Sequence, residues 1–423
     1  MRDLIDDCVH CGFCLPACPT YVSWSEEMDS PRGRIYLMKG LRDGTVAWDE
    51  TVASHFDRCL GCMACVTACP SGVHYDVLIE TTRAAREIAV PRPTADALFR
   101  GLVFFLFPYP LRLRVAGFFL WVLTALGLRA WMERRGLLTK HAPRLAQLQA
   151  LAPSLSFGDL TRTLPAHVRA DGDVRGRVGL VAGCVQRVFF PGVNEATLRV
   201  LAKEGFEVVI PQGQGCCGAL SLHAGREAEA KDFARAIIRH FEDAAVDAII
   251  VNAAGCGSSL KDYGRLFEKD PDWKERARLF SAKVRDINEH LAAVPARATR
   301  HPLKGRVAYH DACHLAHAQK IRSAPRALLA QIPDLTVCEI PDGDQCCGSA
   351  GIYNLVEPAS ANEIGARKVD NVLSTHADAM VSANPGCTLH VQRPLRARGT
   401  TLRAMHPIEV LDHSLRGHPL DDT

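Results

Sequence analysis

Two runs of cysteines near the amino terminus have the residue type and spacing of iron–sulfur ligands. Each run follows the pattern Cys-x2-Cys-x2-Cys-x3-Cys-Pro, and the runs start at Cys8 and Cys59. In runs of this spacing, three cysteines wrap one side of a [4Fe–4S] cluster, and the fourth ligates the other cluster. We therefore expect two [4Fe–4S] clusters, the first on Cys8, Cys11, Cys14 and Cys69 and the second on Cys59, Cys62, Cys65 and Cys18. Zinc in tetrahedral thiolate sites is the alternative, although such sites typically use paired CxxC motifs.

A second cysteine pattern occurs twice in the C-terminal half of the chain. In the first copy 31 residues separate Cys184 from the next cysteine pair, and in the second copy 32 residues follow Cys313 before the equivalent pair. Each group follows a predicted strand, and loops after parallel strands gather at the carboxyl edge of a sheet. The sequence leaves open whether the two groups bind an additional iron–sulfur cluster or form a redox site. Their members are Cys184, Cys216, Cys217 and Cys256, and Cys313, Cys346, Cys347 and Cys387.

The elements that must position these cysteines fall into distinct parts of the chain. Residues 1–90 are predicted to form an all-helical domain, with one helix after the Asp29-Ser30-Pro31 cap signal and another over 76–88. Strand and helix patterns then alternate, which indicates a duplicated α/β domain with a mainly parallel sheet, over 177–295 and 296–415. The expected fold class is therefore α + α/β.

The segment over residues 91–150 is both apolar and basic. It carries nine Arg or Lys against two acidic residues, and its longest apolar run, 115–128, is too short to span a bilayer as a helix. Two interpretations stay open: a helix lying on a membrane surface, or a helix packed on a partner subunit or on the chain's own core. Residues 152–176 are predicted to form a polar linker.

The composition excludes several classes of protein. The chain has 423 residues, 48% of them hydrophobic, and a formal net charge of only +3, so we expect neither disorder nor nucleic-acid binding. Acidic and polar residues follow Met1, so no secretory signal is expected, and disulfides are not expected in a reducing cytosol. No nucleotide-binding glycine motif occurs in the right context, so a flavin is expected on a partner and no catalytic residue on this chain.

Several other residues have two interpretations. His10 and His74 either ligate a metal or have a structural role. Arg32 and Arg34 either place positive charge near a cluster or pair with surface acids. Cys338, in a predicted strand, is expected to be a buried inert thiol. Four polar residues surround Cys313, the first cysteine of the second repeat. They either carry protons to a reducible site or form hydrogen bonds with the backbone of the loop; they are His310, Asp311, His314 and His317.

The motifs together resemble a known family. The strings CVHCGFCLPACPTY, SPRGRIYLMK, DRCLGCMACVTACPSGV, YHDACHLAHAQ and CCGSAGIYN are similar to those of the iron–sulfur subunits of glycolate oxidase (glycolate dehydrogenase), in which a two-cluster helical ferredoxin is fused to two cysteine-rich CCG domains. One departure is clear, because Ala253 and Asn384 replace the first cysteine of the CxxC that ends each CCG motif.

The resemblance implies a place in a larger complex. FAD-binding subunits would oxidise glycolate to glyoxylate, and this chain would pass the electrons toward a quinone-type acceptor. It further implies a cytoplasmic protein, either free or peripheral on the cytoplasmic face of the inner membrane. The alternatives are a heterodisulfide-reductase-like enzyme, or the iron–sulfur subunit of a lactate or glycerol-3-phosphate system.

Overall fold

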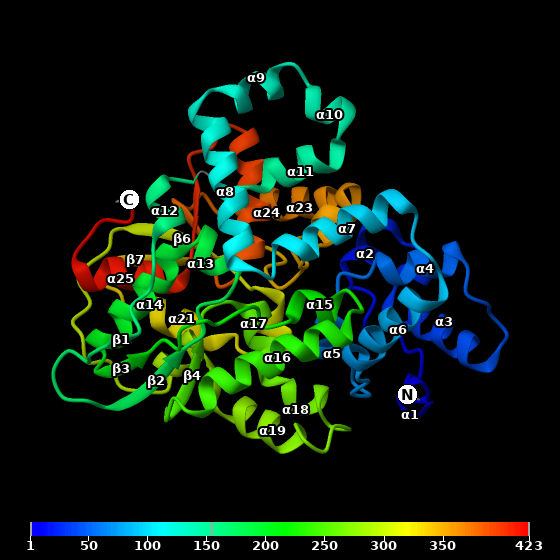
Figure 1. Ribbon diagram of the computed structural model, residues 1–423, viewed down its shortest axis with the longest axis horizontal. Coiled ribbons are helices and arrows are strands. Elements are labelled where there is room, and N and C mark those ends of the chain that lie inside the picture. Colours follow the sequence, from blue (N-terminus) through cyan, green and yellow to red (C-terminus); the bar gives the residue numbers. More distant parts are fainter. Residues whose placement is uncertain (1, 154, 422–423) are drawn as a thin grey trace.

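The amino-terminal part is built of helices and loops in the computed structural model, which describes residues 2–153 and 155–421 (Figure 1). The Ser30 hydroxyl accepts a hydrogen bond from the Gly33 amide at 3.0 Å, and Pro31 occupies the first turn of α3. This confirms the predicted start of that helix. The predicted helix over 76–88 is confirmed as α6. The elements of this part are α1 (Arg2–Asp6), α2 (Pro19–Trp24), the 3-10 helix η1 (Glu27–Asp29), α3 (Pro31–Asp43), α4 (Glu50–Asp57), α5 (Ala64–Ala68) and α6 (Tyr75–Ala89).

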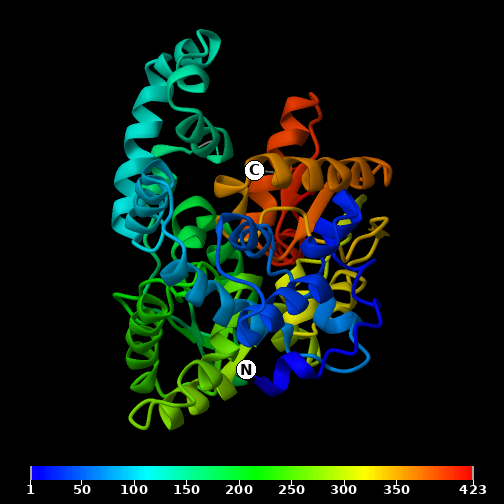
Figure 2. The same ribbon diagram turned by 90° about the vertical axis from the view of Figure 1, so that its right-hand side faces the viewer.

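A helical segment follows and projects from the rest of the molecule in both views (Figures 1 and 2). Its first two long helices are bent by 105° at a break that contains Pro108. The helices are α7 (Thr94–Leu106), α8 (Pro110–Ala125), α9 (Leu128–Arg134), α10 (Leu137–His141), α11 (Pro143–Leu151) and α12 (Phe157–Thr161).

The prediction of a featureless polar linker over 152–176 is wrong. Leu160 of α12 is buried against Leu113 of α8 and against Val188, and the three side chains form a small apolar core. A short strand, β1 (His167–Val168), then pairs antiparallel with β3 (Phe206–Val209). The segment therefore anchors the projecting helices and starts the first sheet.

Two sheets form the rest of the chain, and every strand pair except β1–β3 is parallel. This confirms the α/β class with mainly parallel sheets. The first sheet has the order β1-β3-β2-β4-β5, with β2 (Gly176–Leu180), β4 (Ala248–Val251) and β5 (Val284–Asp286). The second has the order β7-β6-β8-β9, with β6 (Gly305–His310), β7 (Leu335–Glu339), β8 (Ala379–Ser382) and β9 (Arg403–Met405).

The two sheets are copies of one design. Val178 of β2 pairs with Ala248 of β4 just as Val307 of β6 pairs with Ala379 of β8. The first copy adds α13 (Val185–Phe189), α14 (Pro191–Lys203), α15 (Ala219–His223), α16 (Glu227–Glu242), α17 (Ala254–Lys261), α18 (Tyr263–Leu266), α19 (Lys274–Lys283) and α20 (Ile287–Ala292). The second adds the π-helix η2 (His314–Ala318), α21 (Ser323–Leu329), α22 (Tyr353–Val356), α23 (Pro358–Leu373), α24 (Pro385–Ala397) and α25 (Pro407–Arg416).

The largest core lies between the two copies. Helix α14 of the first copy packs on α25 of the second, and α20 of the first packs on α21 of the second. Fully buried side chains from both sheets, such as Leu180 and Tyr309, belong to this one core. Burial of apolar surface is the main stabilising term in folding, so the two copies form one unit whose strand ends are held in fixed relative positions.

Candidate metal centres

The first group of predicted ligands lines one cavity near the protein surface. Cys8, Cys11 and Cys14 lie on the loop between α1 and α2, and Cys69 follows α5. His10 and Gly12 have positive φ angles of 54° and 87°, so the loop coils tightly enough to turn its cysteines toward the cavity. Cys65 of the second group also lines the cavity, and a lining this rich in thiols suits an iron–sulfur cluster.

The second group is more deeply placed. Cys59, Cys62 and Cys65 are buried on the loop before α5 and in its first turn. Cys18, at the end of the first run, is also buried, and it lies within electrostatic reach of Cys62 and Cys65. The fourth cysteine of the first run thus sits among the first three of the second run, as crossed ligation requires.

Burial controls the protonation of these thiols. It raises the pKa of Cys14 to about 11 and that of Cys65 well above its usual range. Because metal ligation requires thiolates, binding to this site must release protons, and the affinity must rise with pH.

Cys59 behaves differently because it has cationic neighbours. Burial alone would raise its pKa, but Arg34 and Arg83 together with a hydrogen bond from Tyr75 hold it below its usual value. The Tyr75 hydroxyl donates to Cys59 Sγ at 3.6 Å, and the Gly61 amide does so at 3.4 Å. These donors orient one sulfur and stabilise its charged form.

The two arginines of the SPRGR string have separate roles. Arg34 is 1% exposed and pairs with the equally buried Asp29 at 3.3 Å, close to Cys18 and Cys59. Arg32, in contrast, pairs with the half-exposed Glu27 at 2.7 Å. Arg32 also lines the first cavity, within electrostatic reach of Cys8 and Cys14, so both arginines place positive charge near a cysteine group and only Arg32 pairs with a surface acid.

The histidines of the amino-terminal part have structural partners. The His10 ring packs edge-on against Tyr36 at 6.3 Å, and His74 precedes α6 and lies 3.8 Å from Asp76. Both side chains are exposed. The four cysteines of each group leave no ligand position that needs either histidine.

The first C-terminal cysteine group converges as its strand order predicts. Cys184 follows β2, Cys216 and Cys217 follow β3, and Cys256 lies in α17 after β4. Cys184 Sγ lies 3.7 Å from Cys216 Sγ. Cys217 contacts both Cys216 and Cys256, and hydrogen bonds from these two thiols lower its pKa. The four sulfurs therefore form one continuous buried row.

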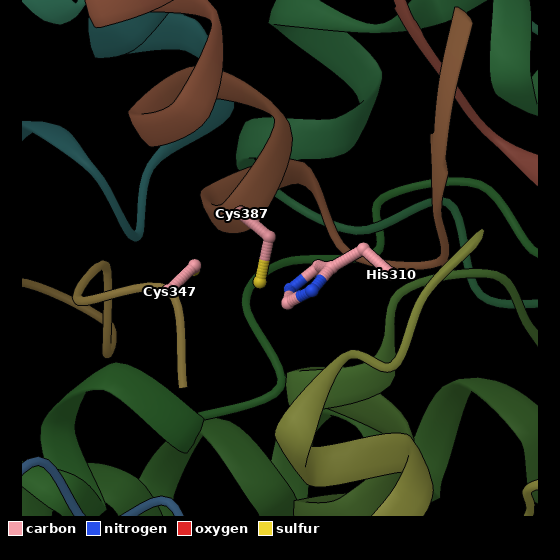
Figure 3. A group of neighbouring side chains, drawn as sticks. All are labelled: His310, Cys347 and Cys387. Atoms are coloured by element: carbon pink, nitrogen blue, oxygen red, sulfur yellow. The ribbon is translucent and has the colours of Figure 1, made fainter. Parts of the chain in front are cut away.

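The second group repeats this arrangement after β6, β7 and β8. Cys346 contacts Cys313 and Cys347, and Cys347 in turn contacts Cys387. His310 lies at the end of β6, and its ring is directed toward the Cys387 sulfur (Figure 3). A ring nitrogen of His310 and the sulfurs of Cys347 and Cys387 lie within 4.8 Å of one another. The sequence placed His310 among proton carriers or backbone partners, whereas its geometry is that of a ligand.

The other polar residues of this loop have protein partners. Asp311 pairs with Arg326 at 2.7 Å, and His317 contacts the Asp344 carbonyl at 2.9 Å. His314 Nδ1 lies 3.5 Å from Cys313 Sγ. The interpretation of these residues as partners of the loop is thus supported for Asp311 and His317.

Cys338 was expected to be a buried thiol. It is only half-buried, on the edge strand β7.

The second group lies directly beside the deeper amino-terminal group. Cys62 and Cys313 are electrostatic neighbours and share a small apolar core with Leu60 and Cys346. His317 also contacts the Thr67 hydroxyl of α5 at 3.0 Å. The helical domain is therefore docked with one cysteine group against the repeat, which nothing in the cysteine spacing could show.

The first copy contacts the helical domain through charge. Glu80 of α6 lies 3.5 Å from His223 of α15 and 2.7 Å from Arg265. Arg83 of the same helix donates to the His223 carbonyl at 2.9 Å and to the Cys59 carbonyl. No pattern in the sequence singles out Glu80 or Arg83, because their partners in the first copy lie more than a hundred residues away.

The two positions that lack the expected cysteine lie at the contact between the copies. Asn384 Oδ1 accepts a hydrogen bond from the Gly255 amide at 3.2 Å, and its Nδ2 donates to Cys387 Sγ at 3.5 Å. Ala253 is buried at the start of α17, next to Gly255. Asn384 thus supplies a hydrogen bond to the sulfur rather than a fifth thiolate.

Comparisons with known proteins agree with this organisation. The model of the 4Fe-4S dicluster domain matches residues 4–73, that of the cysteine-rich domain CCG matches 178–261 and 307–392, and that of the linker region of glycolate oxidase iron–sulfur subunits matches 95–152. The probable glycolate oxidase iron–sulfur subunit of Bacillus subtilis (strain 168) is 36% identical over 96% of this chain and 93% of its own length. The chain belongs to the glycolate oxidase iron–sulfur subunit family.

Two further relatives extend the comparison. The glycolate oxidase iron–sulfur subunit of Escherichia coli (strain K12) is 34% identical over 96% of the chain and 93% of its own length. Lactate utilization protein A of Geobacillus sp. (strain WCH70) is 28% identical over 56% of the chain and 99% of its own length. The resemblance stated from the sequence is confirmed: this glycolate oxidase iron–sulfur subunit is an electron-transfer component of an oxidoreductase that has other subunits, and it carries iron–sulfur clusters.

Proposed function

We propose that this subunit takes electrons from FAD-binding partner subunits that oxidise glycolate to glyoxylate, and passes them to a quinone-type acceptor. The observation that carries the proposal is the pair of four-cysteine groups in the helical domain, which share a border at Cys14, Cys18 and Cys65. When bound, two iron–sulfur clusters supply one-electron carriers at this border. The chain's own contribution is to hold the ligands, exclude water and fix the nearby charge.

The arrangement of the sulfurs supports a ligand assignment. We propose that Cys8, Cys11, Cys14 and Cys69 hold the first cluster and that Cys59, Cys62, Cys65 and Cys18 hold the second. Crossed ligation joins the start and the end of the helical domain, so the two clusters are held at one fixed separation. Arg34 adds buried positive charge on the side of the second cluster only, which favours reduction there.

We propose four functional parts for the chain. They are the two-cluster domain over 1–90, the projecting segment over 91–150, and the two CCG domains over 177–295 and 296–415. The linker between the second and third of these is too well packed to act as a flexible tether, so the projecting segment is expected to move with the CCG domains.

The decisive test uses the full chain purified without oxygen together with its partner subunits. Reduction of an acceptor dye by glycolate is compared for wild type, for Cys62→Ser and for Cys338→Ser, which removes a thiol outside all four groups. The proposal expects Cys62→Ser to abolish dye reduction through this chain while flavin stays on the partner, and Cys338→Ser to leave it unchanged. Lactate or glycerol 3-phosphate as the better donor would instead favour the related systems.

We propose that the projecting segment docks on an anionic lipid surface, which would place the subunit on the cytoplasmic face of the inner membrane. In the described part of the chain no single helix is long and apolar enough to cross a membrane, and only the bent α7–α8 pair has enough apolar length. Helix α8 buries only Leu113 and Gly117, so apolar side chains cover its outer surface. The exposed apolar side chains on α8 and directly after it are Leu111, Val115, Phe118, Phe119, Leu126, Leu128 and Trp131.

Cations surround this apolar surface. Arg112 lies over the Phe105 and Tyr109 rings at 4.2 and 3.9 Å, and Arg134, Arg135 and Lys140 are exposed beyond α8. An apolar face with a basic rim is the composition that binds anionic bilayers. A protein partner would need a complementary acidic rim, so the charge favours lipid.

Sedimentation with vesicles tests the lipid proposal. The full chain is expected to bind vesicles containing phosphatidylglycerol, more weakly at high salt, and Phe118→Glu to reduce binding. Leu279→Glu, at an exposed leucine of α19 far along the chain, is the control and is expected to bind like wild type. The surface would instead be a subunit contact if the wild type binds the partner subunits but not these vesicles, and if Phe118→Glu no longer binds the partner subunits.

A further inference from the structure

The surroundings of the two C-terminal cysteine groups have diverged. The copies align apart from single-residue differences in loop length: Gly218 approaches the Ala230 backbone just as Gly348 approaches that of Ala361. Three residues before the first cysteine of each copy, the first copy has Val181 and the second has His310. The two sulfur rows are alike, so this difference beside them is informative.

Two further aligned positions differ in the same sense. The eleventh residue of the helix behind the cysteine pair is Ile237 in α16 and Lys368 in α23. Three residues after the last cysteine of each copy, the first copy has Ser259 and the second has His390. At these three positions the first copy has neutral groups, whereas the second offers an ammonium and two imidazoles; the cation near the first row, Arg187, lies instead within electrostatic reach of Cys184.

His310 is the most informative of these residues. Its side chain is fully buried, and among the residues that the structure describes its ring nitrogens have no nitrogen or oxygen partner; only the Cys347 thiol lies within reach. Buried polar groups without partners are rare in native proteins and call for an unseen ion or water. The ring points to the Cys387 sulfur in Figure 3, and its nitrogen and the Cys347 and Cys387 sulfurs lie within 4.8 Å of one another.

The spacing of these donors fits a single metal ion. A tetrahedral ion with metal–sulfur bonds of about 2.3 Å places neighbouring sulfur ligands roughly 3.8 Å apart. The row supplies two further thiols, Cys313 and Cys346, as candidates for the fourth position. Thiolate and imidazole donors select zinc or iron over hard cations such as magnesium and calcium.

Lys368 completes the charge balance of this site. Its side chain is 3% exposed, its ammonium donates to the carbonyl oxygens of Asp342 and Gly343 at 2.6 and 3.2 Å, and it lies within electrostatic reach of Cys346 and Cys347. With a third thiolate, from Cys313 or Cys346, in the fourth position, the divalent ion and its ligands carry a net charge of −1, which a buried cation offsets. The apolar Ile237 in the first copy offers no such compensation.

We propose that the second CCG copy alone holds a metal ion of the zinc or ferrous class, with Cys347, Cys387 and His310 as ligands, and that the first copy keeps its four cysteines as metal-free thiols. The ion would lie in the sulfur row whose first member, Cys313, is the electrostatic neighbour of Cys62 in the deeper amino-terminal group. This inference is independent of the donor and acceptor proposed above.

Metal analysis of the full chain purified without oxygen tests it. The wild type is expected to carry one ion per chain beyond the iron of its two clusters, which is about eight. His310→Val, which copies the first repeat, is expected to lose that ion and keep the cluster iron. Cys217→Ser, at the equivalent thiol pair of the first copy, is expected to keep both.

Two measurements keep the test decisive. His310→Cys, which supplies another soft ligand, is expected to retain the ion, so that loss in the valine variant cannot be ascribed to misfolding. After replacement of the ion by Co²⁺, nitrogen coupling in the electron spin resonance signal is expected in wild type and absent in His310→Cys. The proposal is overturned if no metal beyond the cluster iron is found, if Cys217→Ser loses it, or if the extra metal is iron accompanied by sulfide.

Discussion

Removing the buried arginine of the helical domain should destabilise it far more than removing the arginine two positions earlier. The Arg34 guanidinium makes three contacts inside the protein: with the His55 carbonyl at 2.6 Å, with the Thr20 hydroxyl at 3.3 Å and with the Asp29 carboxylate at 3.3 Å. Removing one partner of a buried ion pair typically costs about 3–5 kcal/mol, because the other charge stays buried. His55 and Arg58 also contact Asp29, so Arg34→Met is expected to lower the free energy of unfolding by about 3 kcal/mol, the lower end of that range.

Arg32→Met is the matched control for this prediction. Arg32 and Glu27 are 29% and 38% exposed, and exposed pairs contribute about 0–1 kcal/mol. The assay is the urea concentration at which the visible iron–sulfur absorption is lost under anaerobic conditions, which reports on the helical domain alone. Arg34→Met should also lower the reduction potential of one cluster, since a cation that stabilises the reduced form has gone. Equal midpoints for the two variants would refute the argument that burial sets the importance of Arg34.

Three further outcomes follow from single contacts. Burial lowers the pKa of His406 from 6.5 to about 3, and its neutral ring accepts the hydrogen bond that caps α25. The free energy of unfolding should therefore rise as the pH rises from about 3 to 6.5. His406→Asn should flatten the rise in melting temperature above ~pH 5. Burial would raise the pKa of Glu80, but its basic neighbours hold it at about 2 rather than 4.5, so its contribution is present above pH 4.5 and fades as the pH falls toward 2; Glu80→Gln should remove this acid sensitivity in urea titrations. Gly225→Ala should lower the melting temperature more than Gly172→Ala, because both residues have φ near +80° but only at Gly225 would the new Cβ lie 2.7 Å from the Arg83 carbonyl oxygen; equal shifts would show that the contact is unimportant.

Much of the fold could be predicted because it is encoded locally. The strands that precede the cysteines carry continuous apolar runs, and parallel strands must deliver their following loops to one edge. The convergence of Cys184 with Cys216 therefore needed only the strand order. The start of α3 was equally local, since a serine cap and a proline in the first turn act within one turn of the helix.

Other features could not be predicted because they depend on contacts between distant segments. Arg32 and Arg34 share one short string, and only the packing of α3 against the remaining helices decides that one is buried and the other is not. Likewise the pairing of Glu80 with His223 joins two domains whose relative placement no spacing encodes. The linker prediction failed for the same reason, since Leu160 is one apolar residue in a polar stretch and its importance depends on the core that it meets.

The divergence of the two CCG copies is best understood from where each copy lies. Both have the same sulfur row, so selection for folding alone would give no reason for a lysine and two histidines to gather around one of them. That one is the copy whose first cysteine, Cys313, lies beside Cys62 of the helical domain, whereas the first copy meets that domain through Glu80 and Arg83. A buried metal beside an electron carrier influences its potential through charge, and an ion far from the carrier does not. Position beside the deeper cysteine group therefore explains why only the second copy has the surroundings of a metal centre.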